Sequence, residues 1–466
     1  MNTKALRQKI LDLAIHGKLV PQHPNDEPAS VLLERIRDEK ERLIKEGKIK
    51  RPKKSKTTSD KPHYENVPFE VPSSWVWTTV GEISQSILYG VSESAKSRGT
   101  YRLLRITDIQ DNTVNWNTVP FTDYEDEKAE AYLLKDGDIL FARTGATVGK
   151  SYLVNNLQEK AIYASYLIRV KTNHYVLPEF VKYFFESGFY WEQVLGNSVG
   201  IGQPNVNGTI LSNLELPIPP IMEQKRIVKE LGKWLSIIDK IEESKGLLQK
   251  NISWAKSKVL DLAIHGKLVP QDPTDEPATE LLKRINPNAE ITSDNGHYQK
   301  LPEGWAVCCL ENVAKVLDNL RKPINSNERN SRIANKHENE LFPYYGATGQ
   351  VGFIDDYLVD GTFLLLGEDG APFLDKYAIK SYPIKGKCWV NNHAHILEPQ
   401  CDFDYLMYYL NHVDYKDYVN GSTRLKLTQS DMRSIIILLP PLTEQKRISV
   451  KVKYLFRLLD SIACNL

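Results

Sequence analysis

The sequence lacks several features that would assign it to a common class of protein. It has no apolar run of about 18 residues, the length that a membrane-spanning helix needs. Its start, MNTKALRQKILDLA, is amphipathic and lacks the apolar core of a signal peptide. The five cysteines contain no CxxC pair, which argues against a zinc site or a disulfide framework. We therefore expect a cytoplasmic protein with no membrane segment.

Recognisable catalytic motifs are also missing. The sequence contains no GxGxxG dinucleotide loop, no HExxH motif and no Asp/Asn-Pro-Pro-Tyr/Phe motif for amino methylation of bases. FARTGATVGKS (141–151) resembles a phosphate loop, but only three residues separate Gly145 from Gly149, and a strand-like YLVNN follows. We interpret this stretch as a turn between two strands. A nucleotide hydrolase that uses Gly145–Ser151 is the rival enzyme hypothesis, and otherwise no catalytic residue is predicted.

The net charge is only +1, but the charge is unevenly distributed. Residues 1–63 are basic and include KEGKIKRPKKSK (45–56), whereas residues 64–218 and 297–439 are mildly acidic. The basic run is typical of a solvated linker, and a phosphate-contacting arm is the alternative. If the acidic blocks bind DNA, local basic faces or a partner must supply the attraction to phosphate.

The dominant feature of the sequence is an internal repeat. LDLAIHGKLVPQHPNDEPASVLLERI (11–36) aligns with LDLAIHGKLVPQDPTDEPATELLKRI (260–285), with 21 of 26 positions identical. VPSSWVWTTVGEI (71–83) returns as LPEGWAVCCLENV (301–313), and LPIPPIMEQKRIV (216–228) returns as ILLPPLTEQKRIS (437–449). The chain is therefore two copies of one unit: a leading Pro–Trp segment, a large domain, PPxxEQKR and a helix.

The helix after the first PPxxEQKR has a regular apolar period. Apolar residues recur at alternating steps of four and three, which is typical of a coiled coil. Its 36 residues would span about 54 Å, or about one and a half turns of B-DNA. We expect it to stop at His265–Gly266, and Asp275 to be the N-cap of the next helix. The expected core positions are Ile227, Leu231, Trp234, Ile238, Ile241, Leu248, Ile252, Val259 and Leu262.

The second copy of this helix is split between the two ends of the chain. When the second copy is aligned with the first, the last residue of the chain, Leu466, corresponds to position 245, and the first residue, Met1, corresponds to position 250. Only the four positions between them have no counterpart in the second copy. The sequence therefore predicts a cyclic double repeat that is opened within one helix. The expected core positions of the split helix are Ile448, Val452, Leu455, Leu459 and Ile462, followed by Leu6, Ile10 and Leu13.

The predicted fold class is α+β, with two mixed α/β domains separated by an antiparallel coiled coil in a cyclic pseudo-two-fold repeat. Five segments are expected. They are an N-terminal half helix with a second helix and a basic linker (1–63), a first large domain (64–218), a central helix and turn (219–296), a second large domain (297–439) and a C-terminal half helix (440–466).

In combination, these features resemble the specificity (S) subunit of type I restriction–modification enzymes over nearly the whole chain. The resemblance is carried by PPxxEQKR at 219–226 and 440–447, by the repeated LDLAIHGKLVPQ, and by the pairs Pro72/Trp75 and Pro302/Trp305. It implies that the two large domains are target-recognition domains, each of which reads one half of a bipartite sequence in double-stranded DNA. It also implies that the helices set the spacer between the halves and dock two methylation (M) subunits.

The resemblance further implies that this chain is a non-catalytic subunit with no cofactor of its own. S-adenosylmethionine is expected on the M subunits, and ATP with Mg on restriction (R) subunits. Two alternatives remain: a coiled-coil adaptor that holds proteins rather than DNA, and a specificity module of another restriction class.

Candidate DNA contacts are basic and polar residues in loops, because Arg commonly reads guanine and Asn or Gln reads adenine. His393 and His395 in NNHAHI alternate as in a strand, but the sequence shows no matched ligands nearby, so no metal site is predicted. In the first domain the candidates are Arg102, Arg105, Arg143, Thr144, Lys150, Gln203, Asn205 and Asn207, and in the second they are Arg321, Lys322, Tyr345, Thr348, Gln350, Arg424 and Lys426.

Overall fold

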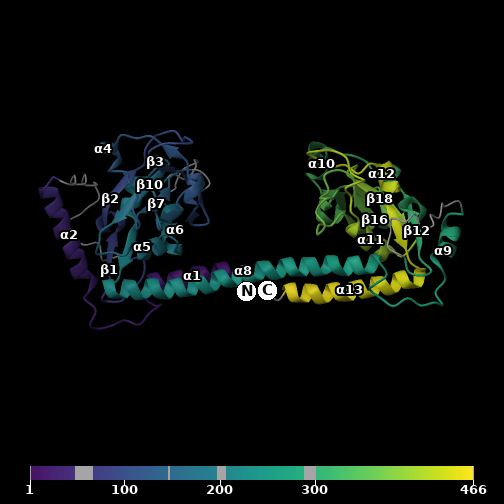
Figure 1. The fold of residues 1–466 in the computed structure, drawn as a ribbon, viewed down its shortest axis with the longest axis horizontal. Coiled ribbons are helices and arrows are strands. Elements are labelled where there is room, and N and C mark those ends of the chain that lie inside the picture. Colours follow the sequence, from purple (N-terminus) through teal and green to yellow (C-terminus); the bar gives the residue numbers. More distant parts are fainter. Residues whose placement is uncertain (1, 48–66, 145–146, 197–205, 288–300, 465–466) are drawn as a thin grey trace. The chain divides into compact units, whose positions relative to one another are not determined.

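The computed structural model describes residues 2–47, 67–144, 147–196, 206–287 and 301–464. The chain forms two compact units, Met1–Glu243 and Ser244–Leu466. Each unit combines helices with β-sheets, as the sequence predicted (Figure 1). Within the described ranges, no helix is both long and apolar enough to cross a membrane.

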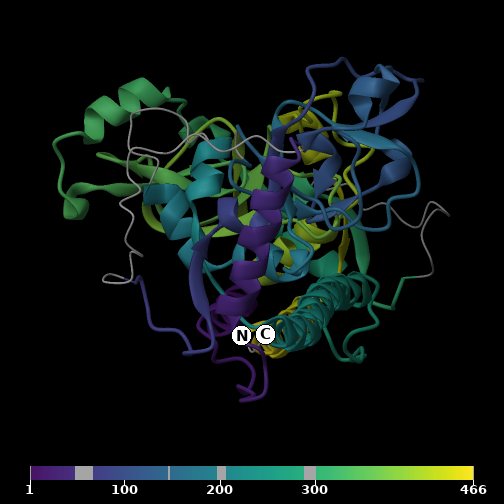
Figure 2. The ribbon, with the colours of Figure 1, turned by 90° about the vertical axis from the view of Figure 1, so that its left-hand side faces the viewer.

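The first unit is built around a four-stranded sheet of order β2-β10-β7-β8 and a three-stranded sheet of order β6-β3-β9. Figure 2 faces this unit and shows α2, in purple, lying across it. Its helices are α1 (Thr3–Ile15), α2 (Ala29–Lys45), α3 (Val80–Ile83), α4 (Asp126–Ala129), α5 (Pro178–Phe184), α6 (Gly188–Gly196), α7 (Gly208–Asn213) and the start of α8 (Ile221–Ile264). Its strands are β1 (Val76–Thr79), β2 (Ser84–Tyr89), β3 (Tyr101–Leu104), β4 (Ile109–Gln110), β5 (Thr113–Val114), β6 (Phe121–Thr122), β7 (Ile139–Ala142), β8 (Ser151–Leu153), β9 (Ala161–Tyr163), β10 (Leu167–Thr172) and β11 (Glu215–Ile218), with short 3-10 helices η1 (Ile106–Asp108) and η2 (Trp116–Thr118).

The second unit has one six-stranded sheet of order β13-β18-β16-β17-β14-β15. After the end of α8, its helices are α9 (Ala278–Ile285), α10 (Ser326–Ile333), α11 (Phe403–His412), α12 (Gln429–Arg433) and α13 (Leu442–Cys464), with 3-10 helices η3 (Leu310–Asn312), η4 (Asp318–Leu320) and η5 (Glu338–Glu340). Its strands are β12 (Ala306–Cys309), β13 (Ala314–Val316), β14 (Phe342–Gly346), β15 (Gly349–Ile354), β16 (Val359–Gly367), β17 (Ser381–Val390), β18 (Ala394–Pro399) and β19 (Ile436–Leu439).

Each large domain is closed by its own first and last strands. In the first unit β1 pairs antiparallel with β11, and in the second β12 pairs antiparallel with β19. The closing strands end at Ile218 and Leu439, directly before the two Pro-Pro pairs. The Pro-Pro pairs thus follow a strand and precede a helix, which suits residues that cannot donate a further ladder bond.

The repeated motifs meet at one junction in each unit. In the second unit Gln271 Nε2 donates to Glu444 Oε1 at 3.0 Å, and Trp305 Nε1 donates to Glu444 Oε2 at 3.0 Å. In the first unit Gln22 Nε2 donates to Glu223 Oε1 at 2.6 Å. Both glutamates are buried. In the second unit the end of LDLAIHGKLVPQ, the Trp of the Pro–Trp segment and the Glu of EQKR therefore form one polar contact, and in the first unit Gln22 and Glu223 make the matching part of it.

The glutamine of EQKR joins the helix start to the large domain. Gln445 Nε2 donates to the carbonyl of Pro440 at 2.8 Å, and its Oε1 accepts from the amide of Asp402 at 2.8 Å. Gln224 makes the matching pair of bonds in the first unit. Because this buried amide both donates to the Pro-Pro turn and accepts from the large domain, it fixes the turn from strand to helix.

The arginine of EQKR corrects one sequence prediction. Arg447 Nη2 lies 2.6 Å from Asp275 Oδ2, and Arg226 Nη2 lies 2.5 Å from Asp26 Oδ2. The N-cap of α9 is Pro277, which makes no side-chain cap bond. The prediction that Asp275 caps this helix was therefore wrong, because its carboxylate instead binds the guanidinium of the distant motif.

Substituting Glu444 by Gln should destabilise the second unit. A Gln side chain has one acceptor oxygen, so it leaves one of the donors Gln271 and Trp305 unpaired in a buried site, at a cost of about 1–3 kcal/mol in the free energy of unfolding. Urea denaturation measures this cost. The control is Lys446→Gln, because Lys446 is exposed and lies two residues after Glu444. This variant should change the free energy of unfolding by about 0.5 kcal/mol or less.

The same variant should change the pH dependence of stability. Burial raises the pKa of Glu444, so the folded protein binds this proton more tightly than the unfolded chain. Wild-type stability should therefore rise relative to Glu444→Gln as the pH falls from above the folded pKa towards the ordinary value for Glu. A constant difference across this range would contradict the buried carboxylate.

The helix ends are confirmed. The helix predicted after the first PPxxEQKR is α8, and it ends at Ile264, directly before His265–Gly266. Gly266 has φ +66°, and His265 Nδ1 lies 2.7 Å from the carbonyl oxygen of Asp261. The ring of His265 therefore contacts a carbonyl of the last turn, and Gly266 adopts the left-handed conformation that ends the helix.

Most of the expected core positions of the helices are buried or half-buried, with two exceptions. Trp234 is 39% exposed and Ile462 is 47% exposed, so neither belongs to the core of its unit. Leu235 is buried in place of Trp234, because α8 packs on the first large domain as well as beside α1, which moves its buried stripe by one residue. Ile227, Leu231, Ile238, Ile252, Ile448, Val452 and Ile10 are buried, and Ile241, Leu248, Val259, Leu262, Leu455, Leu459, Leu6 and Leu13 are half-buried.

Candidate nucleic-acid interface

Two of the arginines chosen from the sequence of the first domain are held by acidic neighbours. Arg102 lies over the ring of Phe121 and makes a two-pronged pair with Glu159, at 2.8 and 2.9 Å. Arg105 makes a similar pair with Asp108, at 2.7 and 3.0 Å. Arg102 is largely buried, whereas the side chain of Arg105 is 41% exposed. We therefore keep Arg105 as a candidate contact and assign Arg102 a structural role.

The turn between β7 and β8 carries the strongest candidate of this domain. The two strands pair antiparallel, which confirms the interpretation of FARTGATVGKS as a turn between strands rather than a phosphate loop. Arg143 stands at the start of this turn, with its guanidinium carbon 5.1 Å from the ring centre of Tyr89. Within the described part of the chain, Arg143 Nε is buried and has no hydrogen-bond partner. The residue as a whole is half-buried, so part of its side chain is open to a ligand group that the chain itself does not supply.

Two tyrosines that the sequence prediction missed frame Arg143. Tyr166 is 61% exposed, and its carbonyl accepts from the amide of Arg143 at 3.0 Å. Tyr89 is 37% exposed, and its hydroxyl accepts from the amide of Gly208 at 2.8 Å. We call Tyr89, Arg143 and Tyr166 the first reading cluster. No pattern in the sequence distinguishes these tyrosines, because they are two among 23 and stand in segments far apart along the chain.

The remaining candidates of the first domain differ in placement. Lys150 is exposed and lines a cleft of about 820 Å³ together with Thr147 and the α1 residues Lys4 and Arg7. Thr144 is half-buried beside Arg143. Asn207 is the N-cap of α7, where its side-chain oxygen accepts from the amide of Ile210, so its carbonyl serves the helix. Gln203 and Asn205 lie outside the described residues.

The candidates of the second domain fall into two groups. Arg321 is largely buried: it lies 3.1 Å from Asp318 and also pairs with Glu368, so we assign it a structural role. Arg424 and Lys426 are exposed and come from the segment Gly421–Thr428 before α12. The other candidates, Lys322, Thr348 and Gln350, are exposed, and Tyr345 is half-buried with its ring centre 6.1 Å from that of Tyr382.

Both exposed cations of the Gly421–Thr428 segment already contact acidic residues. Arg424 Nε lies 2.6 Å from Asp369 Oδ1, and Lys426 Nζ lies 3.2 Å from Glu368 Oε1. In both pairs the cation is the exposed partner, so Arg424 and Lys426 present positive charge to the solvent, where a phosphate can also approach. We call Arg424 and Lys426 the second basic pair, after the second domain in which they lie.

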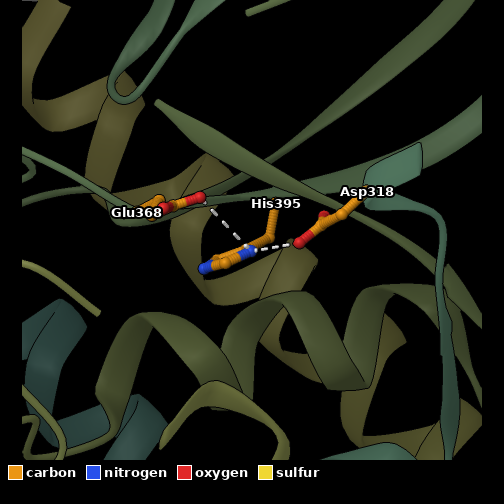
Figure 3. Close-up of side chains that lie close together, drawn as sticks. All are labelled: Asp318, Glu368 and His395. Atoms are coloured by element: carbon orange, nitrogen blue, oxygen red, sulfur yellow. Dashed lines mark hydrogen bonds and ion pairs between the residues drawn. The ribbon is translucent and has the colours of Figure 1, made fainter. Parts of the chain in front are cut away.

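A buried group of ionisable residues lies directly under the second basic pair. His395 is fully buried, with Nδ1 at 2.7 Å from Asp318 Oδ2 and 3.8 Å from Glu368 Oε2 (Figure 3). The sequence prediction missed this group, because Asp318 and Glu368 stand far from His395 along the chain and only the fold of β16, β18 and η4 joins them.

The geometry of this group favours an ion-pair network over a metal site. Possible ligand atoms of Asp318, Glu368 and His395 lie within 4.8 Å of one another. However, the guanidinium of Arg321 contacts both carboxylates, and a cation next to it would be repelled. Although burial alone would raise the pKa of Asp318, the hydrogen bond and the charge of His395 lower it. The charges of the group are thus balanced by the chain's own residues.

Comparison with known proteins places this chain among DNA specificity proteins. The family model for the "Type I restriction modification DNA specificity domain" matches residues 72–249 and 302–464. The EcoAI specificity subunit of Escherichia coli, a type I restriction enzyme subunit, is 31% identical over 68% of this chain and 63% of its own length. The EcoEI specificity subunit of Escherichia coli is 24% identical over 99% of this chain and 90% of its own length.

The fold is also similar to that of a solved structure. It comes from work on complex assembly and conformational transition of the type I R-M system, with a TM-score of 0.55 and 18% identity, over 85% of this chain and 94% of that chain. The alignment with the EcoAI subunit spans less than two thirds of that subunit. At 18% identity, the solved structure shows a likeness of fold alone. The assignment of this chain to a family rests on the family model.

Proposed function

This chain belongs to the type I restriction–modification DNA specificity family, and on that basis we propose that it reads a bipartite sequence in double-stranded DNA for a multisubunit complex. The observation that carries the proposal is the double match of the specificity domain, once in each unit. Two recognition domains in one chain contact two separate DNA sites, and each site contributes its own part of the sequence.

The two domains differ in the groups that they offer to DNA, which supports an asymmetric target. The first domain offers an arginine framed by two tyrosines, and the second offers the second basic pair above acidic residues. Arginine makes two-pronged contacts with guanine, whereas exposed Lys and Arg in loops also neutralise phosphates. We propose Arg143 as a base-reading residue, and Lys150, Arg424 and Lys426 as contacts to the DNA backbone or base edges.

We also propose that the helices form an antiparallel coiled coil with pseudo-two-fold symmetry, which sets the spacer between the two half-sites. Three observations support this arrangement. A single helix, α8, belongs to both units; α1 pairs with it through Arg7–Asp239 in the first unit; and α13 pairs with it through Lys256–Asp460 in the second. The matched junctions at Glu223 and Glu444 are what a repeated unit requires.

The methylation subunits are proposed to dock on the exposed faces of these helices. Exposed apolar residues recur every four positions along α13, which places them on one stripe, and others lie on α8. Contiguous exposed apolar surface on a helix is typical of a protein interface. The stripe residues are Val450, Tyr454, Leu458 and Ile462, and those of α8 are Trp234, Ile237, Leu247 and Trp254.

Tyr454→Asp should therefore weaken binding of the methylation subunit at least about tenfold, because a charge replaces an aromatic anchor in the interface. The free energy of unfolding of the isolated chain should stay within about 0.5 kcal/mol, since Tyr454 is exposed there. Titration of the chain with the M subunit measures the affinity. Lys453→Ala, which removes an exposed cation of the same helix that pairs with Asp404 rather than with the stripe, is the matched control, and equal losses in both variants would contradict a specific stripe.

The chemistry is proposed to reside on the partners. In this proposal the chain is non-catalytic and cytoplasmic, the M subunits hold S-adenosylmethionine, and R subunits use ATP and Mg. The rival proposals are a coiled-coil adaptor for proteins and a specificity module of another restriction class. A chain that binds its M partner but confers no DNA sequence preference would favour the adaptor.

The experiment that tests the function is to express this chain with its M subunit in a host that lacks adenine methylation and to map methylated adenines across the genome. We expect one motif of two short defined parts separated by a fixed number of unspecified bases. Methylation without a motif, or with one uninterrupted motif, would contradict the proposal.

A further inference from the structure

The contacts of His395 specify the protonation state of its ring. Nδ1 lies 2.7 Å from a carboxylate oxygen of Asp318, and Nε2 lies 3.0 Å from the carbonyl oxygen of Leu427. Both of these partners can only accept a hydrogen bond from the ring. A neutral imidazole has one N–H, so its unprotonated nitrogen, itself an acceptor, would face the acceptor oxygen of Asp318 or of Leu427. The imidazolium has two N–H groups and donates to both oxygens. The geometry thus selects the protonated ring.

The ring sits between two parts of the second domain. Asp318 belongs to η4 and His395 to β18, whereas Leu427 belongs to the segment that carries the second basic pair. Asp318 also accepts from the amide of Ile396 at 3.0 Å and from Gln429 Nε2 at 2.8 Å. The imidazolium of His395, which stands in β18, therefore links the Gly421–Thr428 segment to the sheet. Its Nε2 donates to Leu427 of the segment, and its Nδ1 donates to Asp318 of η4.

A second set of bonds holds the same segment next to the ring. The amide of Leu427 donates to the carbonyl of Glu368 at 2.8 Å, and the amide of Gly370 donates to the carbonyl of Leu425 at 3.1 Å. Lys426 lies between these two anchors, and its backbone pairs with Asn420 in both directions, at 2.8 and 3.0 Å. The position of the second basic pair therefore depends on how firmly Leu427 is held.

The charged groups around the ring come from every neighbouring element. Asp318 and Glu368 carry negative charge, Arg321 contacts both of them, and Lys426 contacts Glu368 from the solvent side. With the ring protonated, two carboxylates face two buried cations, and Lys426 adds a third cation at the rim. Removal of the ring proton leaves Arg321 as the one buried cation beside the two carboxylates, with Lys426 at the rim, and takes away one of the two donors of the ring.

From this geometry we propose that His395, in its imidazolium form, is a positioning residue for DNA binding by the second domain. It holds Leu427, and through it Arg424 and Lys426, in the place where they meet DNA. The inference rests on the proposed function for its DNA readout, but the protonation of the ring and its bond to Leu427 are properties of the chain alone. Affinity for DNA should therefore depend on the proton that lets the ring donate at both nitrogens.

The test combines two measurements on the full chain with its M subunit. Nitrogen-15 NMR of histidine-labelled protein reports whether the ring of His395 is protonated and at which pH it titrates. Fluorescence anisotropy with a labelled duplex that carries the mapped methylation motif reports the affinity across the same pH range. We expect the affinity to fall about tenfold with a midpoint that coincides with the ring titration, as loss of one charge-assisted bond predicts.

Two variants separate positioning from general pH effects. His395→Gln, which has no titrating ring, should bind DNA about tenfold more weakly at low pH and lose this pH dependence. His337→Gln, which removes an exposed histidine of the same unit, should bind and titrate as wild type does. A neutral His395 ring at the pH of strong binding, or the same pH slope in His395→Gln and wild type, would overturn the inference.

The ring measurement remains decisive in two further cases. If His395→Gln does not fold, the wild-type comparison still tests the proposal, since non-coincident midpoints overturn it. If wild type binds no duplex in preference to random sequence, the proposed function fails, whereas the ring measurement still tests the geometry of His395.

Discussion

Substitution of Gly17 by Ala should lower the free energy of unfolding of the first unit by about 3 kcal/mol. Gly17 has φ +68°, a conformation that costs an L-residue about 1–2 kcal/mol. A Cβ at this position would also lie 2.5 Å from Cδ and Cγ of Pro72, and such overpacking adds about 1–3 kcal/mol. Gly17 therefore allows the close contact between LDLAIHGKLVPQ and the Pro–Trp segment.

A matched control isolates the packing cost. Gly47 has nearly the same backbone conformation, with φ +69°, but a Cβ there has no neighbour within 4 Å among the described residues. Gly47→Ala should therefore cost about 1–2 kcal/mol, the backbone strain alone. Urea denaturation followed by tryptophan fluorescence measures both variants. Equal losses would mean that Pro72 yields freely, and the junction would then not be tightly packed.

Substitution of Arg143 by Ala should weaken binding to the target duplex by about tenfold to a hundredfold. A two-pronged contact between Arg and guanine accounts for about 1–3 kcal/mol, and each 1.4 kcal/mol changes the affinity tenfold. Arg143 is suited to this contact because its side chain is half-buried rather than enclosed and its guanidinium lies over Tyr89, beside the exposed Tyr166. Fluorescence anisotropy at fixed salt measures the affinity.

Two further variants separate base reading from charge. Arg143→Lys keeps the positive charge but loses the planar fork, so it should recover binding to random-sequence DNA but not to the target. Lys96→Ala removes an exposed cation of the same domain that pairs with Asp123 at 3.0 Å, and it should change the affinity by about twofold or less. If Lys96→Ala and Arg143→Ala were equally weak, the loss would reflect general charge rather than base reading.

The architecture was accessible from the sequence because it depends on repeated and periodic patterns. The end of α8 at His265–Gly266 and the strand that ends before each Pro-Pro pair follow from local preferences of Gly, Pro and helix caps, which the sequence displays directly. The mixture of helices and sheets in both units follows from the same patterns. The roles within EQKR did not follow, because Glu444 and Arg447 act on residues more than 130 positions away.

The candidate site was less accessible because loop residues are fixed by tertiary contacts. Arg102 and Arg321 looked like DNA contacts, but acidic partners distant in sequence hold them. Asn207 looked like an adenine reader, yet it caps α7. Trp234 fitted the heptad pattern and is nevertheless exposed, since α8 packs against a domain as well as a helix. A residue type that suits DNA recognition equally suits internal pairing, and only the fold distinguishes the two.

The most direct test of the central claim is the methylation motif written by wild type and by two variants, Arg143→Lys in the first domain and Arg424→Lys in the second. If each domain reads its own half-site, wild type should give a bipartite motif. Each variant should then relax base preference in one half only, a different half for each variant. Loss of preference in both halves from a single substitution, or the absence of two separated halves in wild type, would contradict the account.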